Sequence, residues 1–190
     1  RDAAAPSLRP LLTGRMIALG VAFLFAAAGP VGISVLVGVA ARDVLELSGT
    51  ATGLVLFGGA MSALLLGPTW GQVLDRFGAR AVGLAAATSA TVLAGLPSLA
   101  GSGWTLAVIW IIASAAISAV VVVFQALGAS IMPENRGGAL SFLLSFRFVG
   151  HAVGPIVFVP LIDWSARGAF FMAAGLGLVT TAVIGTFRTS

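Results

Sequence analysis

Two basic side chains lie deep inside an apolar stretch of this sequence, where a charge is costly. Arg147 and His151 are four residues apart within 138–162, so they share one face of a helix. If this stretch spans a bilayer, Arg147 lies about nine residues, or roughly 14 Å, from its start, which is near mid-membrane. A charge at that depth costs at least about 2.5–3.5 kcal/mol, and such residues usually face a cavity or a partner.

Several kinds of chemistry fit this pair. Arg147 can attract an anionic substrate or gate a pathway by pairing with a carboxylate from another part of a larger protein. His151, the only histidine, can take up a proton near neutral pH because its reference pKa is about 6.5. A structural role is also open, with Arg147 donating to backbone carbonyls and His151 packed in the helix. Gln125, within 104–132, is a further candidate for a cavity contact or an interhelical hydrogen bond.

A short charged segment, GQVLDRFGAR at 71–80, interrupts apolar sequence on both sides. Arg76 and Arg80 fit a signal that keeps a loop on the cytoplasmic side, but acidic residues contribute little to topology. Asp75 therefore needs another explanation. Its carboxylate, at a helix end, can face the positive N-terminus of a neighbouring helix or pair with an arginine. Close helix approach and a positive-φ turn are permitted by the two glycines of the segment, Gly71 and Gly78.

The composition places these residues in a membrane protein. Of 190 residues, 59% are hydrophobic and only 8% are charged, against about 25% charged in a soluble domain. Because the hydrocarbon core is about 30 Å thick and each helical residue rises about 1.5 Å, one span needs roughly 20 apolar residues. The apolar stretches predict an all-α bundle of six transmembrane helices, at about 16–41, 50–74, 81–100, 104–132, 138–162 and 168–187, with a turn at 101–103.

Glycine and proline punctuate several of these spans. Proline removes a backbone donor and kinks a helix, which predicts interruptions at three pairs: Gly29-Pro30, Gly67-Pro68 and Gly154-Pro155. These pairs either shape the helices or belong to a transporter whose bent helices move around a central site. Gly150 and Gly154 also have the four-residue spacing that lets helices pack closely.

A faint internal repeat relates the two halves of the chain. Asp75 follows one glycine–proline pair by seven residues, and Asp163 follows another by eight, with an arginine shortly after each. The two stretches are three spans apart, so they end on opposite sides of the membrane. This arrangement is that of an inverted 3+3 helix repeat.

The arginines predict the orientation in the membrane. Only Arg42 and Arg167 fall in loops on one side, whereas the other side holds Arg1, Arg9, Arg15, Arg76, Arg80, Arg136 and Arg188. The positive-inside rule then places both termini in the cytoplasm of a multi-pass protein of the plasma (inner) membrane. The net charge of +4 is explained by this topology, so no nucleic-acid partner is expected.

The charged segment carries a resemblance. The pattern Gly71-x-x-x-Asp75-Arg76-x-Gly78-x-Arg80 resembles the signature loop between the second and third helices of each half in the major facilitator superfamily of secondary transporters. Ala79 departs from the pattern, because a basic residue is more usual there. The stretch PENRGGALSFLLSFRFVGHAVGPIV resembles the loop and helix after the fourth span of a half in drug-exporter-like members.

The resemblance implies one half of a major facilitator fold that moves a small molecule by alternating access. Proton-coupled efflux is expected, with the lipid bilayer and the other six-helix half as partners and with no cofactor. The segment 71–80 would act as a conformational latch, and the main partner of Asp75 would lie in the other half. If protons are the coupling ion, this half supplies at most His151, because no Asp or Glu lies deep in any span.

The same resemblance predicts which half is present. N-terminal halves often carry an arginine inside the fourth helix, and 104–132 has none. The lead RDAAAPSLRP resembles the end of a central cytoplasmic linker, so residues 1–12 are interpreted as linker and 13–190 as the C-terminal half of a longer protein. A half-size transporter that acts as a homodimer is the alternative.

Enzymatic functions fit the sequence poorly. A rhomboid-like intramembrane protease needs a Gly-x-Ser-Gly motif, and GASI at 128–131 lacks the second glycine. The chain has no cysteine, which excludes thiol catalysis and cysteine metal sites. No His/Glu cluster indicates a metal, and no phosphate-binding loop indicates ATP as the direct energy source.

Overall fold

The computed structural model describes residues 12–187, and this part of the chain is helical with no β-strand. The main elements are α1 (Gly14–Ala28), α2 (Ser34–Val39), α3 (Gly49–Phe77), α4 (Ala79–Gly95), α5 (Gly103–Ile131) and α6 (Arg136–Thr186). Short 3₁₀ or π turns lie at Ala40–Val44, Leu96–Leu99 and Pro133–Asn135. The predicted linker, apart from its last residue, and Arg1, Arg9 and Arg188 lie outside the described residues.

Within residues 12–187, four helical segments are long and apolar enough to cross a membrane: Gly49–Phe77, Ala79–Leu99, Gly103–Ile131 and Pro133–Thr186. The last of these covers two predicted spans, which meet at one non-helical residue, Ser165 (φ −163°, ψ 105°). The Ser165 hydroxyl accepts a hydrogen bond from the Gly168 N–H at 3.0 Å, which starts the second half of α6 as an N-cap does. The connection predicted at 163–167 is therefore shorter than expected, because one serine both ends the first half and caps the second.

The first predicted span, 16–41, is broken in the middle. α1 ends at Gly29, and the chain turns through 29–33 before α2 begins. Since Pro30 has no N–H, the Ala26 carbonyl accepts instead from the Val31 N–H at 2.8 Å. The predicted interruption at Gly29-Pro30 is confirmed, and it is a full break rather than a kink.

The other two glycine–proline pairs leave their helices continuous. α3 runs through Gly67 and Pro68, and α6 runs through Gly154 and Pro155. Proline fixes φ near −65°, which a helix accepts, so a missing donor does not by itself end the helix. The predicted interruptions at these two pairs are wrong.

The predicted turn at 101–103 is confirmed. Ser102 forms a capping box at the start of α5, where its hydroxyl accepts from the Thr105 N–H at 3.3 Å. The Thr105 hydroxyl accepts in return from the Ser102 N–H at 3.1 Å. Two otherwise unpaired N–H groups are satisfied at this helix end, so α4 and α5 can lie antiparallel with a short connection.

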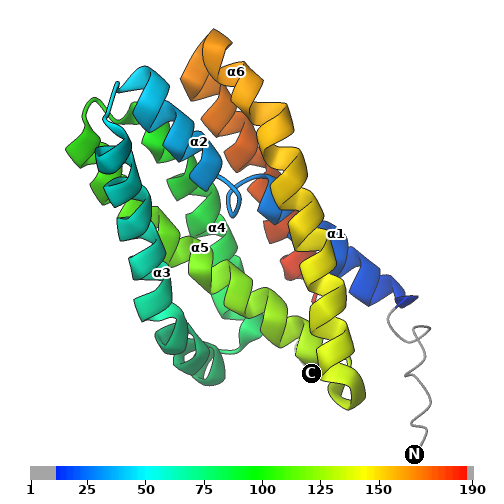
Figure 1. The fold of residues 1–190 in the computed structure, drawn as a ribbon. Coiled ribbons are helices and arrows are strands. Elements are labelled where there is room, and N and C mark those ends of the chain that lie inside the picture. Colours follow the sequence, from blue (N-terminus) through cyan, green and yellow to red (C-terminus); the bar gives the residue numbers. More distant parts are fainter. Residues whose placement is uncertain (1–11, 188–190) are drawn as a thin grey trace, which may run out of the picture.

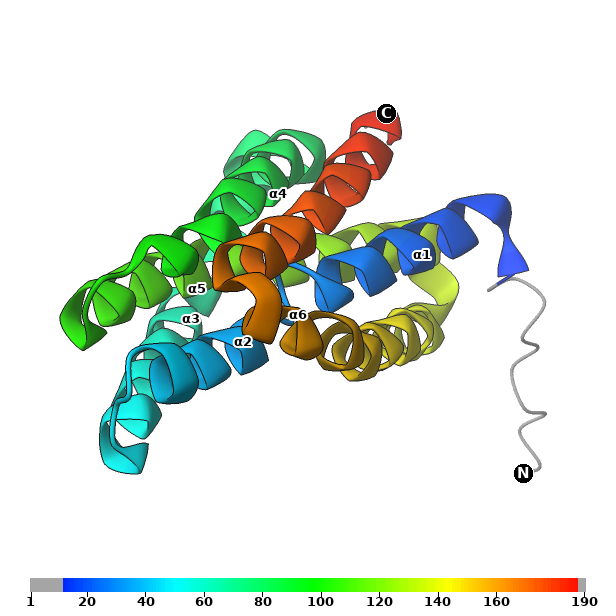
Figure 2. The same ribbon diagram turned by 90° about the horizontal axis from the view of Figure 1, so that it is seen from above.

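α1 lies between the two halves of α6, which diverge from the break at Ser165 (Figure 2). From the second half, the Thr180 hydroxyl donates to the Ala22 carbonyl at 3.2 Å. On another side of α1, Phe23 stacks on Phe124 of α5 with ring centroids 4.3 Å apart. These contacts bury α1 more completely than its 15 residues of sequence would suggest.

Two glycines on the first half of α6 allow its close approach to α1. A Cβ atom at Gly150 would lie 2.7 Å from the Ala27 Cβ and would overlap the Leu24 carbonyl. At Gly154, a Cβ would overlap the Ala28 carbonyl. The small-residue packing predicted from the spacing of these glycines is confirmed.

The two ends of the bundle differ in what they carry. The start of α1, the α3–α4 and α5–α6 connections and the end of α6 lie at one end (Figure 1). The α2–α3 and α4–α5 connections and the break in α6 lie at the other end (Figure 1). An even number of crossings gives this arrangement.

We expect Gly150→Ala to destabilise the protein. The added methyl group meets the backbone of α1, and overpacking of this kind costs about 1–3 kcal/mol, against a helix-propensity gain of up to about 1 kcal/mol. Gly175→Ala on the same helix is the control, because a Cβ there meets nothing within 4 Å. Thermal unfolding in detergent should show a lower Tm for Gly150→Ala and an equal or higher Tm for Gly175→Ala. Equal Tm values for Gly150→Ala and wild type would contradict the packing described.

Candidate functional site

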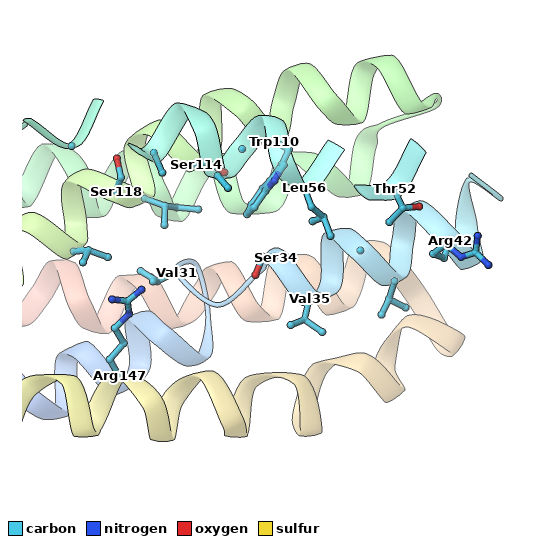
Figure 3. Close-up of a pocket in the computed structure, with 18 of the residues that line it drawn as sticks. Val31, Ser34, Val35, Arg42, Thr52, Leu56, Trp110, Ser114, Ser118 and Arg147 are labelled. Carbon is cyan, nitrogen blue, oxygen red and sulfur yellow. The ribbon is translucent and has the colours of Figure 1, made fainter. Parts of the chain in front are cut away.

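An open cleft of about 1040 Å³ runs between α2, α3 and α5, with the side chain of Arg147 reaching it from α6 (Figure 3). Most of its wall is apolar, including Val31, Val35 and Leu56. The exposed Arg42 and Asp43 lie at its rim, where one positive and one negative charge offset each other. Below the rim, Arg147 is the only charged residue that lines the cleft in the described part of the chain.

Arg147 is held by a chain of hydrogen bonds that begins at the break after α1. In an unbroken helix the Val31 N–H would bond to the Ala27 carbonyl, but here it bonds to Ala26, which leaves the Ala27 carbonyl free. His151 Nδ1 lies 3.2 Å from this carbonyl oxygen. Arg147 Nε donates to His151 Nε2 at 3.3 Å.

These contacts define the state of His151. An arginine N–H can only donate, so His151 Nε2 must accept and cannot carry a proton. The ring proton is then on Nδ1, where it donates to the Ala27 carbonyl. A second proton would turn Nε2 into a donor that faces the Arg147 donor. His151 in this arrangement is therefore a neutral positioning group for Arg147.

The turn after α1 depends on Gly32 for its tight approach to His151. A Cβ atom at Gly32 would overlap the Ala27 carbonyl and lie 3.1 Å from His151 Nδ1. A glycine at this position thus leaves room for the hydrogen bond between the ring and the carbonyl. The sequence pattern did not single out Gly32, because only the folded turn brings it next to His151.

Three buried polar atoms at the cleft have no hydrogen-bond partner within residues 12–187: Thr52 Oγ1, Trp110 Nε1 and Ser114 Oγ. Their side chains are only 8%, 5% and 4% exposed, and all three residues line the cleft. A buried polar group without a partner costs about 1–3 kcal/mol, so native proteins rarely leave one without a reason. Sequence reasoning missed Thr52 and Trp110, since nothing in an apolar run shows which polar atom is unpaired.

Neighbouring polar groups in the same region are satisfied. Trp70 Nε1, on α3, donates to the Ala115 carbonyl at 3.0 Å and to Ser118 Oγ at 2.9 Å. The Ser118 hydroxyl in turn donates to the Ala115 carbonyl at 2.7 Å. Ser118 also lines the cleft, so the unpaired state of Ser114 and Trp110 is specific to their position.

The remaining candidates from the sequence are spread over the fold. Gln125 is half-buried on α5 and does not line the cleft with Arg147. Gly67 lines the cleft, whereas the buried Gly29 and Pro30 act through the break in the first span. Of the three residues proposed for substrate or gating, the structure joins Arg147 to His151 and leaves Gln125 apart.

The charged loop forms the connection between α3 and α4. Gly78 has φ +81°, so the predicted positive-φ turn is confirmed. Arg80 donates to the Gly185 carbonyl at the end of α6 at 3.0 Å, and Arg76 lies over the Phe77 ring at 5.3 Å from its centroid. Asp75 is exposed at the end of α3. Gly71 is half-buried on α3, and a Cβ added there would meet nothing within 4 Å.

Metal chemistry finds no support in the described residues. Within 12–187 no group of three or more His, Cys, Asp or Glu side chains lies close enough to hold a metal ion. The cleft instead combines one fixed cation, unpaired polar atoms and an apolar wall inside a bundle of apolar helices. This set is suited to holding a small molecule within a membrane.

A comparison with protein families matches residues 11–189 to the Major Facilitator Superfamily. The chain belongs to this superfamily. A search of curated proteins gives no match. Members of the Major Facilitator Superfamily are transporters rather than enzymes, so the chain is part of a multi-pass membrane transporter. In this superfamily member, the loop at 71–80 and the cleft at Arg147 are separate features.

We expect His151 to be a neutral imidazole with its proton on Nδ1. Ring-¹⁵N-labelled histidine can be observed by NMR, and the His151 signal is the one that disappears in His151→Asn. Arg147→Gln removes the Nε–H donor and should raise the fraction of the Nε2–H tautomer. A wild-type signal from the Nε2–H tautomer or from imidazolium would contradict the arrangement.

Proposed function

We propose that this chain is the C-terminal half of a secondary active transporter, drug-exporter-like, that moves a small molecule across the plasma (inner) membrane by alternating access. The observation that carries this proposal is the open cleft with Arg147 in its wall. Its volume of about 1040 Å³ lies at the upper end of the usual range for small-molecule sites, about 300–1,000 Å³. A site that is shared with a second half would be open on one side, as this cleft is.

In this proposal the described helices make six crossings. α1 and α2 together make one broken crossing, α3, α4 and α5 make one each, and the two halves of α6 make the last two, in a 3+3 arrangement. Discontinuous helices are typical of transporter sites. Exposed apolar side chains at opposite ends, such as Trp104 at 84% and Trp164 at 90% exposure, would contact the lipid bilayer.

The cytoplasmic end is proposed to be the one with the α3–α4 and α5–α6 connections. Arg15, Arg76, Arg80 and Arg136 belong to this end, whereas Arg42 and Arg167 belong to the other. The positive-inside rule favours this orientation. Both termini of the half would then be cytoplasmic, and Asp75 would face the cytoplasmic side of the second half as part of a latch.

Proton-coupled efflux is the proposed mode of coupling. Every acidic residue in the described part lies at or near a helix end: Asp43, Glu46, Asp75, Glu134 and Asp163. A carboxylate that carries protons through the membrane would therefore come from the other half. His151 already holds Arg147 and the Ala27 carbonyl, so its role in the proposal is to position Arg147. The alternative of a half-size homodimer predicts a purified protein with the mass of one half per chain.

Alternating access can be tested by single-cysteine labelling, because this chain contains no cysteine of its own. Val35→Cys places a thiol in the cleft wall, and Phe77→Cys places one beside the proposed latch. In vesicles of the full-length transporter, a transported compound should change the two rates of labelling by a charged maleimide in opposite directions. Rates that change together, or not at all, with a compound that the protein transports would contradict alternating access.

We expect Asp75→Asn to slow transport at least several-fold, because a neutral amide cannot hold a charged latch. Glu134→Gln is the matched control, since it neutralises another exposed carboxylate at the same end of the bundle. Initial rates should be compared in vesicles at equal amounts of inserted protein. An Asp75→Asn variant with wild-type rates would remove Asp75 from the latch.

A further inference from the structure

We propose that the cleft selects amphipathic organic anions that carry a second hydrogen-bond acceptor. Arg147 binds the anionic group, and Trp110 and Ser114 bind the second acceptor. This inference rests on the proposed function, because it names the class of substrate for the same cleft. It is carried by the three unpaired polar atoms together with the fixed position of Arg147.

The cleft is rich in donors and poor in acceptors. A guanidinium group and an indole N–H can only donate, and the Ser114 and Thr52 hydroxyls can do both. The Nε of Arg147 is used by His151, so its terminal NH₂ groups remain for a ligand. Figure 3 shows Arg147 pointing from α6 across the cleft toward the wall that carries Ser114 and Ser118. A ligand that satisfies this set must supply acceptors.

Trp110 and Ser114 present their polar atoms at one place on the α5 wall. A Cβ atom at Gly59 would overlap Trp110 Nε1 and lie 2.6 Å from Ser114 Oγ, so both atoms meet the backbone of α3 at this glycine. Gly59, Trp110 and Ser114 all line the cleft. The only atom that Trp110 Nε1 can bind is an acceptor, and the structure offers none among the described residues.

The charge of the cleft decides between anion and cation. Arg42 and Asp43 offset each other at the exposed rim, and Arg147 remains as an uncompensated positive charge below it. A cationic ligand would meet Arg147 in a poorly hydrated site, where like charges repel strongly. Apolar walls such as Val31, Val35 and Leu56 favour a ligand with an apolar body between its two polar groups.

Four matched probes test this inference on the full-length transporter in detergent, by calorimetric titration. They are 6-methoxy-2-naphthoate, 2-naphthoate, 6-methoxy-2-naphthamide and (6-methoxy-2-naphthyl)methylammonium. The methoxy carboxylate should bind about tenfold or more tightly than the amide and the ammonium, because a charge-assisted hydrogen bond is worth about that factor. It should also bind about fivefold more tightly than 2-naphthoate, which lacks the second acceptor.

Two substitutions locate the effect. Arg147→Gln should remove the preference for the anion, and Trp110→Phe should remove the advantage of the methoxy group while the ring is kept. Trp70→Phe is the matched control, because it removes an indole N–H that is already bonded to Ala115 and Ser118. This control should leave both preferences unchanged, even if it lowers Tm.

The outcomes separate this inference from the proposed function. Equal binding of all probes, tighter binding of the ammonium, or no binding of the carboxylates would overturn the inference. A methoxy advantage that persists in Trp110→Phe would also overturn the role of Trp110, with water as its partner instead. If the carboxylates bind as expected but are not moved across vesicles, the proposed function fails and the inference stands. If neutral compounds are transported and Arg147→Gln has no effect, the inference fails and the function stands.

Discussion

The carbonyl group of Ala27 is the interaction on which the rest of the cleft depends. Pro30 cannot donate, so the hydrogen bonds at the end of α1 shift by one residue and this carbonyl is left without a backbone partner. In an apolar bundle an unpaired carbonyl is costly, and His151 satisfies it. The ring is thereby fixed, and its other nitrogen holds Arg147 at the cleft.

Close packing makes this interaction possible. His151 reaches α1 because Gly150 and Gly154, on either side of it, bring α6 into contact with the α1 backbone. Lipid tails are as apolar as leucine, so membrane helices associate through packing of small residues and through hydrogen bonds rather than through a hydrophobic drive. The divergent halves of α6 around α1 (Figure 2) combine both effects, since glycine contacts and the Thr180 hydrogen bond hold opposite sides of α1.

The two functional features of the chain differ in how much of their chemistry lies within it. The cleft is built from α2, α3, α5 and α6, and its cation is already held by neighbours in this chain. The loop after α3 is shaped by Gly78 and tied to α6 through Arg80, but its carboxylate at Asp75 is exposed. A cleft that is open on one side and an exposed carboxylate at one end are both surfaces on which a second half can act.

The sequence by itself determined the membrane class, the approximate helices, the break at Gly29-Pro30, the turn at Gly78 and the importance of Arg147 and His151. These follow from local rules: the length of apolar runs, the missing proline donor, and the cost of a buried charge. Only the tertiary structure decided that α3 continues through Pro68, that His151 bonds to Ala27, and that Trp110 and Ser114 lack partners while Trp70 and Ser118 have them. Whether a polar atom is satisfied depends on which helix faces it, and no local pattern carries that information because the partners are far apart in the sequence.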